Sequence, residues 1–156
     1  MKKILKYLIV IILVSGILFA VFFRLKSQKV IYAATNNSTS DVQLIARAIN
    51  GEARGESYEG QVAVGAVILN RVKSSKFPNT IAGVIYQSGA FTAVSDGQIN
   101  VPINPNSTVV KAAQDALNGW DPTGGAIYYF NPDTATNSWI WSRPQIKTIG
   151  SHIFCK

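Results

Sequence analysis

The sequence predicts an α+β domain that is mainly helical with a small β component. Apolar residues recur at helical spacing between residues 44 and 49, and residues 62–69 form an uncharged apolar run inside a segment of helical length. Beyond residue 125, short apolar segments alternate with turn residues, a pattern typical of strands. These three observations favour a helical core with a few short strands near the C-terminus.

The charge of the chain is concentrated before residue 41. Its 156 residues carry 15 basic and 8 acidic side chains, for a net charge of +7. Residues 1–40 hold six of the basic side chains and no acidic one, which leaves nine basic and eight acidic side chains, or +1, for residues 41–156. A near-neutral domain argues against nucleic-acid binding, which needs basic charge on the folded part.

Residues 7–23 form an uncharged apolar run. With Ile4 and Leu5 it reaches about 20 residues, enough to span a bilayer as a helix. Two interpretations stay open: a signal anchor that keeps the run as a membrane helix, or a signal peptide cleaved near Ala34. In both, the domain lies outside the cytoplasm, either membrane-anchored by residues 7–23 or secreted.

Composition divides the chain into three parts. Residues 1–33 are the predicted signal anchor or signal peptide, residues 34–40 are small and polar and form a predicted linker, and residues 41–156 form the folded domain. A length of about 116 residues is common for one domain with a substantial core.

The first half of the domain is predicted to hold three helices. The first should start at Ser40, because Ser40 and Gln43 form a capping-box pattern. The second is expected over residues 60–73 and should be buried on all sides, because apolar residues surround its axis. Asn79 is predicted to cap a short third helix that ends near Tyr86.

The second half is predicted to hold a loop, a helix and short strands. Residues 88–106 are rich in Gly, Ser, Asn and Pro and should form a long loop, with room for a short hairpin. Asn106 or Ser107 should cap a further helix that Gly119 ends. Strands or extended segments are expected at residues 126–130, 139–141 and 146–149.

A glutamate near the end of the first helix is the main candidate for chemistry. On a helical wheel with about 100° per residue, Glu52 falls in the middle of the apolar stripe of residues 44–49. A carboxyl group held there points toward the interior or a cleft wall, where desolvation disfavours the ionised form. A general acid for glycosidic cleavage needs a protonated carboxyl group. The alternative is a fraying helix end that turns Glu52 to solvent.

Other acidic and nucleophilic residues give weaker signals. Glu56 shares the same face only if the helix continues past Gly55, and otherwise it is a solvated residue of a turn. Cys155 is the only cysteine, so it can form neither an intrachain disulfide nor a Cys–Cys metal pair. Its nearness in sequence to His152 is poor evidence for a catalytic pair. No metal-ligand spacing is visible, so we expect neither a metal nor a cofactor.

Aromatic residues crowd the C-terminal quarter of the chain, interleaved with amides. Tyr128, Asn131 and Trp141 belong to this group, which suits a carbohydrate-binding cleft through ring stacking and hydrogen bonding. The alternative is that most of these rings are core, because aromatic side chains dominate core area.

Several longer motifs occur together and in order. They are spread over about residues 42–155 and include Asn50–Glu56, Glu59–Val64, Leu69–Val72, Phe77–Ile81, Ala116–Ala126, Trp139–Arg143 and Ile149–Phe154. In these motifs the chain resembles the spore cortex-lytic enzyme family of bacterial cell-wall hydrolases.

The resemblance implies a lysozyme-like, lytic-transglycosylase-type fold, with residues 41–156 as the catalytic domain. It implies cleavage of the peptidoglycan bond between N-acetylmuramic acid and N-acetylglucosamine by one glutamate, and Glu52 is the matching position. Six further residues are expected to bind substrate: Glu56, Gln61, Phe91, Tyr128, Asn131 and Trp141. The implied partners are peptidoglycan glycan strands and, through the N-terminal segment, a membrane. The implied roles are spore cortex lysis and germination, by a protein anchored in the membrane or secreted to the cell wall.

Three other functions stay open. One is a catalytically silent peptidoglycan-binding module. Another is a hydrolysing muramidase, which needs a second carboxylate about 5 Å from the first when it retains configuration, and no convincing partner for Glu52 is visible. A lytic transglycosylase needs none, because the substrate's own C6 hydroxyl attacks the anomeric carbon. The third, an amidase or peptidase, lacks visible zinc ligands and a nucleophile–base pair.

Overall fold

A computed structural model describes the backbone of residues 2–156 and the side chains of residues 15–28 and 40–156. The chain divides into two compact units, Met1–Thr39 and Ser40–Lys156. In the first unit the described backbone is helical and belongs to α1 (Lys2–Ala53). Where side chains are described, no helix has a stretch long and apolar enough to cross a membrane. Residues 7–14 of the expected membrane span lie outside those described side chains.

The helix that was expected to start at Ser40 starts far earlier, so this boundary is wrong. α1 continues through residues 34–40 and ends at Ala53. The physical reason is that these small polar residues include neither Gly nor Pro, so none of them strongly breaks a helix. Within the second unit, the apolar face of residues 44–49 is confirmed: Ile45, Ala48 and Ile49 are fully buried and Leu44 is partly buried.

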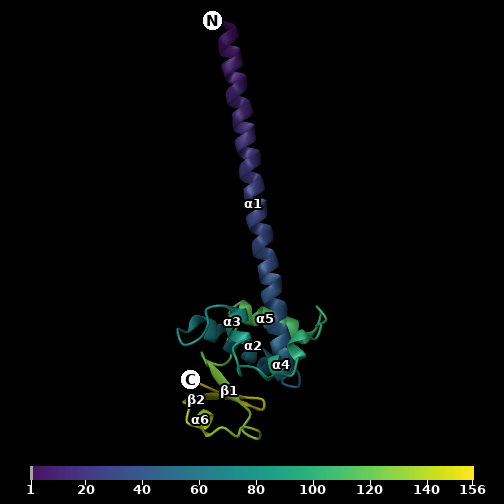
Figure 1. Cartoon of the computed structure of the whole chain (residues 1–156), viewed down its shortest axis with the longest axis vertical. Helices are drawn as coiled ribbons and strands as arrows, with labels where there is room; N and C mark the ends of the chain where they lie inside the picture. Colours follow the sequence, from purple (N-terminus) through teal and green to yellow (C-terminus); the bar gives the residue numbers. More distant parts are fainter. Residues whose placement is uncertain (1) are drawn as a thin grey trace. The chain divides into compact units, whose positions relative to one another are not determined.

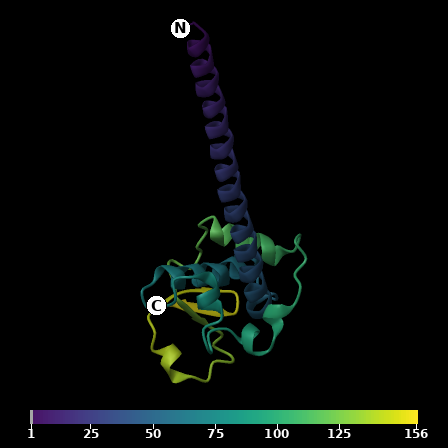
Figure 2. The same cartoon turned by 45° about the horizontal axis from the view of Figure 1, so that its top comes forward.

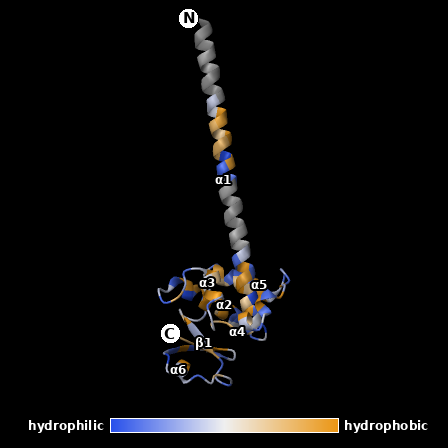
Figure 3. Ribbon diagram, in the orientation of Figure 1, coloured by the Kyte–Doolittle hydropathy of each residue, from blue (hydrophilic) through white to orange (hydrophobic). Residues whose placement is uncertain are grey.

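The core of the second unit is built around α2 (Tyr58–Lys73). This agrees with the prediction that the helix over residues 60–73 is buried on all sides. Val62, Val64 and Ile68 of this helix have no exposed surface, and Figure 3 shows α2 as a largely hydrophobic ribbon. The last turns of α1 pack into the same core, as do α3 (Ile81–Ile85) and α5 (Thr108–Leu117).

Local capping sets where these helices begin. The Ser57 hydroxyl accepts a hydrogen bond from Gly60 N–H at 3.2 Å and starts α2, and the Thr80 hydroxyl accepts from Gly83 N–H at 3.0 Å and starts α3. The expected cap at Asn79 is therefore one residue early. Ser107 is the N-cap residue of α5, one of the two positions expected.

The long loop of residues 88–106 contains no hairpin. It holds two short helices instead, α4 (Thr92–Ser95) and the 3₁₀-helix η1 (Gln98–Asn100). Phe91, just before α4, is buried in the core and ties the loop down, and the Asp96 carboxylate accepts from Gln98 N–H at 3.0 Å between the two helices. These local hydrogen bonds satisfy the backbone without a strand partner.

A three-stranded antiparallel sheet completes the second unit, in the order β1-β3-β2. It consists of β1 (Tyr128–Phe130), β2 (Gln145–Ile149) and β3 (His152–Cys155), and the described register pairs Tyr129 with Phe154. Figures 1 and 2 show these strands gathered beside α2, with α6 (Ser138–Trp141) close to them. The third strand was not expected, and the extended segment expected at residues 139–141 is a helical turn.

The start of α6 explains that second difference. The Asn137 side chain accepts a hydrogen bond from Trp139 N–H at 3.0 Å, which begins a helical turn in spite of the strand propensity of Trp and Ile. The mainly helical architecture with a small β component is confirmed.

Asp121 holds the turn that carries the chain from α5 to β1. Its Oδ1 accepts from the Thr123 hydroxyl at 2.6 Å and from Thr123 N–H at 2.8 Å, and its Oδ2 accepts from Asn70 Nδ2 at 2.9 Å and from Gly125 N–H at 3.0 Å. Desolvation raises the pKa of Asp121, but these four hydrogen bonds outweigh it and lower the pKa below its ordinary value of 3.8. The charged form of Asp121 therefore stabilises the folded chain.

Replacing Asp121 with Asn should lower the free energy of unfolding by roughly 1–3 kcal/mol at neutral pH, because one amide cannot accept all four bonds. A group whose pKa is lowered by folding gives stability above its unfolded pKa, and that stability is lost as the pH falls through the folded pKa. The deficit of the variant should therefore shrink in acid, which urea unfolding at several pH values would measure. The exposed Asp133→Asn variant is the matched control, and equal unfolding curves for the two variants would contradict the prediction.

Candidate active site

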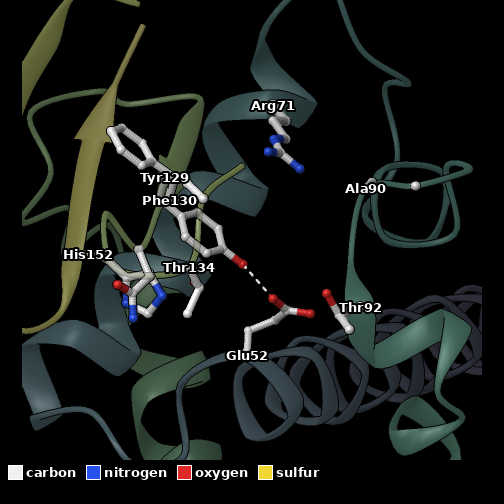
Figure 4. Close-up of a pocket in the computed structure, with 11 residues that line it drawn as sticks. Glu52, Arg71, Ala90, Thr92, Tyr129, Phe130, Thr134 and His152 are labelled. Atoms are coloured by element: carbon white, nitrogen blue, oxygen red, sulfur yellow. Dashed lines mark hydrogen bonds between the residues drawn. The ribbon is translucent and has the colours of Figure 1, made fainter. Parts of the chain in front are cut away.

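Glu52 lies in the last turn of α1 and faces an open cleft of about 330 Å³. The orientation that the helical wheel predicts is confirmed, since the side chain lines the cleft rather than pointing to open solvent. Figure 4 shows the carboxylate between Tyr129 on one side and Thr92 on the other. The cleft is lined by Glu52, Arg71, Gly89, Ala90, Thr92, Tyr129, Phe130, Asn131, Thr134, Ala135 and His152.

Two donors hold the Glu52 carboxylate. Oε1 accepts from Ala93 N–H at 2.9 Å, and Oε2 accepts from the Tyr129 hydroxyl at 3.2 Å. Burial and the neighbouring charge of Glu52 raise the pKa of Tyr129 well above its ordinary value of 10.0, although Arg71 opposes the rise. Tyr129 therefore keeps its proton near neutral pH and remains available as a donor to this carboxylate.

Tyr129→Phe should lower the glycan cleavage that the family resemblance implies about 10- to 100-fold, because a hydrogen bond to a charged acceptor contributes about 1.5–3 kcal/mol. The ring itself should keep its packing against His152 and Phe154, whose centroids lie 5.2 and 5.8 Å away. The measurement is kcat on purified sacculi together with the thermal midpoint.

Tyr58→Phe is the matched control for this change. The Tyr58 hydroxyl donates to Asp115 at 2.5 Å, and Tyr58 does not line the cleft. This control should change the thermal midpoint and leave kcat nearly unchanged. A Tyr129→Phe variant that cleaves at the wild-type rate would show that the phenol does not support the reaction.

Glu56 has a different environment from Glu52. Its Oε1 lies 3.5 Å from His152 Nδ1, and its Oε2 accepts from Ser151 N–H at 3.1 Å. The carboxylate fills the space beside Gly150, where an added Cβ would overlap it and where φ is +56°. Glu56 thus ties the chain after α1 to the turn between β2 and β3, and it does not line the cleft.

Arg71 forms part of the cleft wall although only 7% of it is exposed. Its Nε donates to the Ile127 carbonyl at 2.7 Å. Its guanidinium lies 5.2–5.8 Å from the ring centroids of Phe77, Phe91 and Tyr128. Burial lowers the pKa of Arg71, an effect that the negative charge of Glu52 opposes, and an arginine stays charged under either influence.

The six residues that were expected to bind substrate lie in different places relative to the cleft. Asn131 lines the cleft. Gln61 and Phe91 are 5% and 4% exposed and lie in the interior, so direct contact with a glycan is not supported for either. Tyr128 does not line the cleft. Its ring is tilted against Phe77 and edge-on to Trp139, and the guanidinium groups of Arg71 and Arg143 lie over it.

Trp141 and Glu56 complete the set. Trp141 is exposed and packs edge-on against Phe130, a lining residue, with ring centroids 4.8 Å apart. It therefore lies beside the cleft rather than in its wall. Glu56 does not line the cleft, but it contacts His152, which does.

Three side chains of the site, Tyr129, His152 and Arg71, are not among the expected site residues, although Tyr129 belongs to the aromatic group of the C-terminal quarter. Tyr129 and His152 come from β1 and β3, and no pattern in the sequence brings these strands to the end of α1. The position of Arg71 could have been predicted from the sequence, because it lies at helical spacing from Val64 and Ile68, two buried residues of the same helix. A cation on a buried helix face requires a special environment.

The Cys155–His152 alternative receives no support. The Cys155 thiol is fully buried in β3, and burial raises its pKa, so it lacks the exposed thiolate that a nucleophile needs. Among the described side chains, no group of three or more His, Cys, Asp or Glu could hold a metal ion.

The mainly helical unit with its small antiparallel sheet thus carries a cleft in which Glu52 is the one carboxylate among the described lining residues. The chain belongs to the Cell Wall Hydrolase family, which matches residues 55–155. Glu52 lies just before the matched range.

Similar proteins carry more specific names. The chain is 67% identical over 119 residues to the spore cortex-lytic enzyme of Bacillus cereus, an alignment that covers 76% of this chain. The chain spans only 45% of the length of that relative. The fold is similar to the crystal structure of the catalytic domain of the Bacillus cereus SleB protein, with a TM-score of 0.71 and 67% identity over 76% of this chain and 91% of the other.

A second solved structure agrees with the first. It is the catalytic domain of the germination-specific lytic transglycosylase SleB from Bacillus anthracis, with a TM-score of 0.70 and 67% identity. The match covers 74% of this chain and 93% of the other.

Proposed function

We propose that this domain is a lytic transglycosylase that cleaves the bond between N-acetylmuramic acid and N-acetylglucosamine in peptidoglycan. Glu52 is its single general acid and base. The observation that carries the proposal is that Glu52 is the one carboxylate among the described residues lining the cleft. The similarity to a domain described as a germination-specific lytic transglycosylase supports the same reaction.

The proposed cycle needs only this carboxyl group. Protonated Glu52 gives its proton to the glycosidic oxygen as the bond to the muramic C1 breaks. The C6 hydroxyl of the same muramic residue then attacks C1, and its proton returns to Glu52, which leaves a 1,6-anhydro end. The hydrogen bonds from Ala93 N–H and the Tyr129 hydroxyl stabilise the carboxylate that forms between the two proton transfers.

Product analysis tests the reaction type. Mass spectrometry of digested sacculi should show anhydromuramic ends, each 18 mass units (roughly one water) lighter than a reducing end, because no water enters the product. Reducing muramic ends would instead indicate a hydrolysing muramidase. Glu56 would then be the first candidate for the second carboxylate, although His152 and Ser151 already engage it.

We further propose the setting in which this reaction occurs. The name of the similar Bacillus cereus enzyme supports spore cortex peptidoglycan as the substrate, and the description of the similar Bacillus anthracis domain supports action during germination. We place this action outside the cytoplasm, where peptidoglycan lies. Asn131 in the cleft wall and Trp141 beside it are the best placed of the expected substrate-binding residues. Anchoring by residues 7–23 stays a prediction.

A further inference from the structure

Arg71 faces the cleft with unused donors. Its Nε donates to Ile127, which leaves the four N–H groups of its two terminal nitrogens. Among the described residues, these nitrogens make no hydrogen bond to a protein acceptor. Figure 4 shows the guanidinium directed toward the space between Tyr129 and Ala90, which is part of the cleft.

Glu52 does not satisfy this cation by direct contact. Both residues line the same cleft, yet in the described part of the chain no ion pair within 4.0 Å joins them. Arg71 therefore acts on Glu52 through space. The terminal nitrogens of Arg71 are not among the buried atoms that lack a hydrogen-bond partner, so the exposed 7% of the residue leaves them open to the cleft, where an acceptor on a substrate can replace water.

Three rings restrict where the guanidinium can turn. Phe77, Phe91 and Tyr128 surround it, and the bond to Ile127 fixes its Nε edge. A guanidinium held on aromatic faces is weakly hydrated and keeps its planar fork in one orientation. The free donors are thus preorganised for an acceptor that enters from the cleft.

We propose that Arg71 binds a carbonyl oxygen of an amino-sugar substituent, either N-acetyl or lactyl, and so holds the glycan chain across the cleft from Glu52. This inference rests on the proposed function, because that function supplies the glycan. Carbonyl oxygens are the strong acceptors of such a substrate, and the planar fork of an arginine can give two N–H groups to one site. Arg71 is thereby a substrate-binding residue with no acid–base role.

The test compares two arginines on the same aromatic ring. Arg71→Met removes the cation from the cleft wall, whereas Arg143→Met removes a guanidinium 5.2 Å from the centroids of Tyr128 and Trp139 that does not line the cleft. We expect KM on solubilised peptidoglycan strands to rise roughly 10- to 100-fold for Arg71→Met and to change little for Arg143→Met. Arg71→Lys should recover part of the loss, because it keeps the charge without the fork.

Binding measurements identify the carbonyl. In a Glu52→Gln background, calorimetry would compare tetra-N-acetylchitotetraose, which carries only N-acetyl groups, with a GlcNAc–MurNAc tetrasaccharide. Weaker binding of both probes by Arg71→Met assigns the N-acetyl carbonyl, and weaker binding of the muramyl probe alone assigns the lactyl carbonyl. Unchanged binding of both probes by a folded variant would overturn the proposal.

A measurement on the unaltered arginine covers the case in which Arg71→Met fails to fold. In the Glu52→Gln protein, the side-chain ¹⁵N signals of Arg71 should shift when the muramyl tetrasaccharide is added, and those of Arg143 should not. The absence of any Arg71 shift at saturation would reject the inference. Failure of the proposed function is a separate result, namely wild-type cleavage by Glu52→Gln.

Discussion

Glu52→Gln should abolish peptidoglycan cleavage and leave the fold intact. The amide cannot give a proton to the glycosidic oxygen, and general acid–base catalysis contributes about 10²- to 10⁴-fold. Glutamine keeps the shape of the side chain, and its carbonyl can still accept from Ala93 N–H. Its NH₂ group would face the Tyr129 oxygen, which can accept as well as donate. The measurements are the release of soluble fragments from sacculi and the binding of the variant to the same sacculi.

Two other glutamates of the domain make this test specific. Glu59 forms an exposed ion pair with Lys147 at 3.2 Å, so Glu59→Gln should be close to neutral. Glu56→Gln should weaken the contact with His152 and Ser151 and lower activity less than the loss of Glu52. If Glu56→Gln were as inactive as Glu52→Gln in a folded protein, a two-carboxylate mechanism would replace the single-acid one. Cleavage at the wild-type rate by Glu52→Gln would remove Glu52 from the chemistry.

The orientation of Glu52 could be predicted from sequence because it depends on one local regularity. Helical spacing alone places residue 52 over the stripe of residues 44–49, and α1 remains helical through Ala53. The burial of α2 could be predicted for the same reason. In both cases the relevant neighbours lie within a few turns along one helix.

The rest of the site depends on contacts between distant segments. Tyr129 reaches Glu52 from 77 positions along the chain, and Ala93 reaches it from 41. Periodicity carries no information about such pairs, because they arise from how α4 and the sheet pack against the helices. For Arg71, helical spacing was enough to predict a position on a buried helix face. The rings that surround its guanidinium could not be predicted, because they come from three other segments.

Gly51→Ala should damage both stability and activity, in contrast to the usual effect of this substitution inside a helix. Alanine is favoured over glycine by about 1 kcal/mol at an exposed helix position. At residue 51, however, an added Cβ would overlap the Cβ of Ala93 and lie 3.3 Å from its Cα. Ala93 is fully buried at the start of α4, and its backbone cannot rotate away as a long side chain would. We expect a net loss of about 1–3 kcal/mol in the free energy of unfolding.

The same overlap should reduce cleavage beyond what the lost stability explains. Ala93 N–H is the donor to Glu52 Oε1, so pushing α4 away from α1 weakens the bond that holds the catalytic carboxylate. Gly55→Ala is the matched control, because a Cβ at residue 55 meets nothing within 4 Å. Urea unfolding and kcat on sacculi, measured well below the unfolding midpoint, separate the two effects. A Gly51→Ala protein with wild-type stability and turnover would show that α4 can move away from α1 without loss of stability. The close approach of Gly51 to Ala93 would then not be needed to hold Glu52 in place.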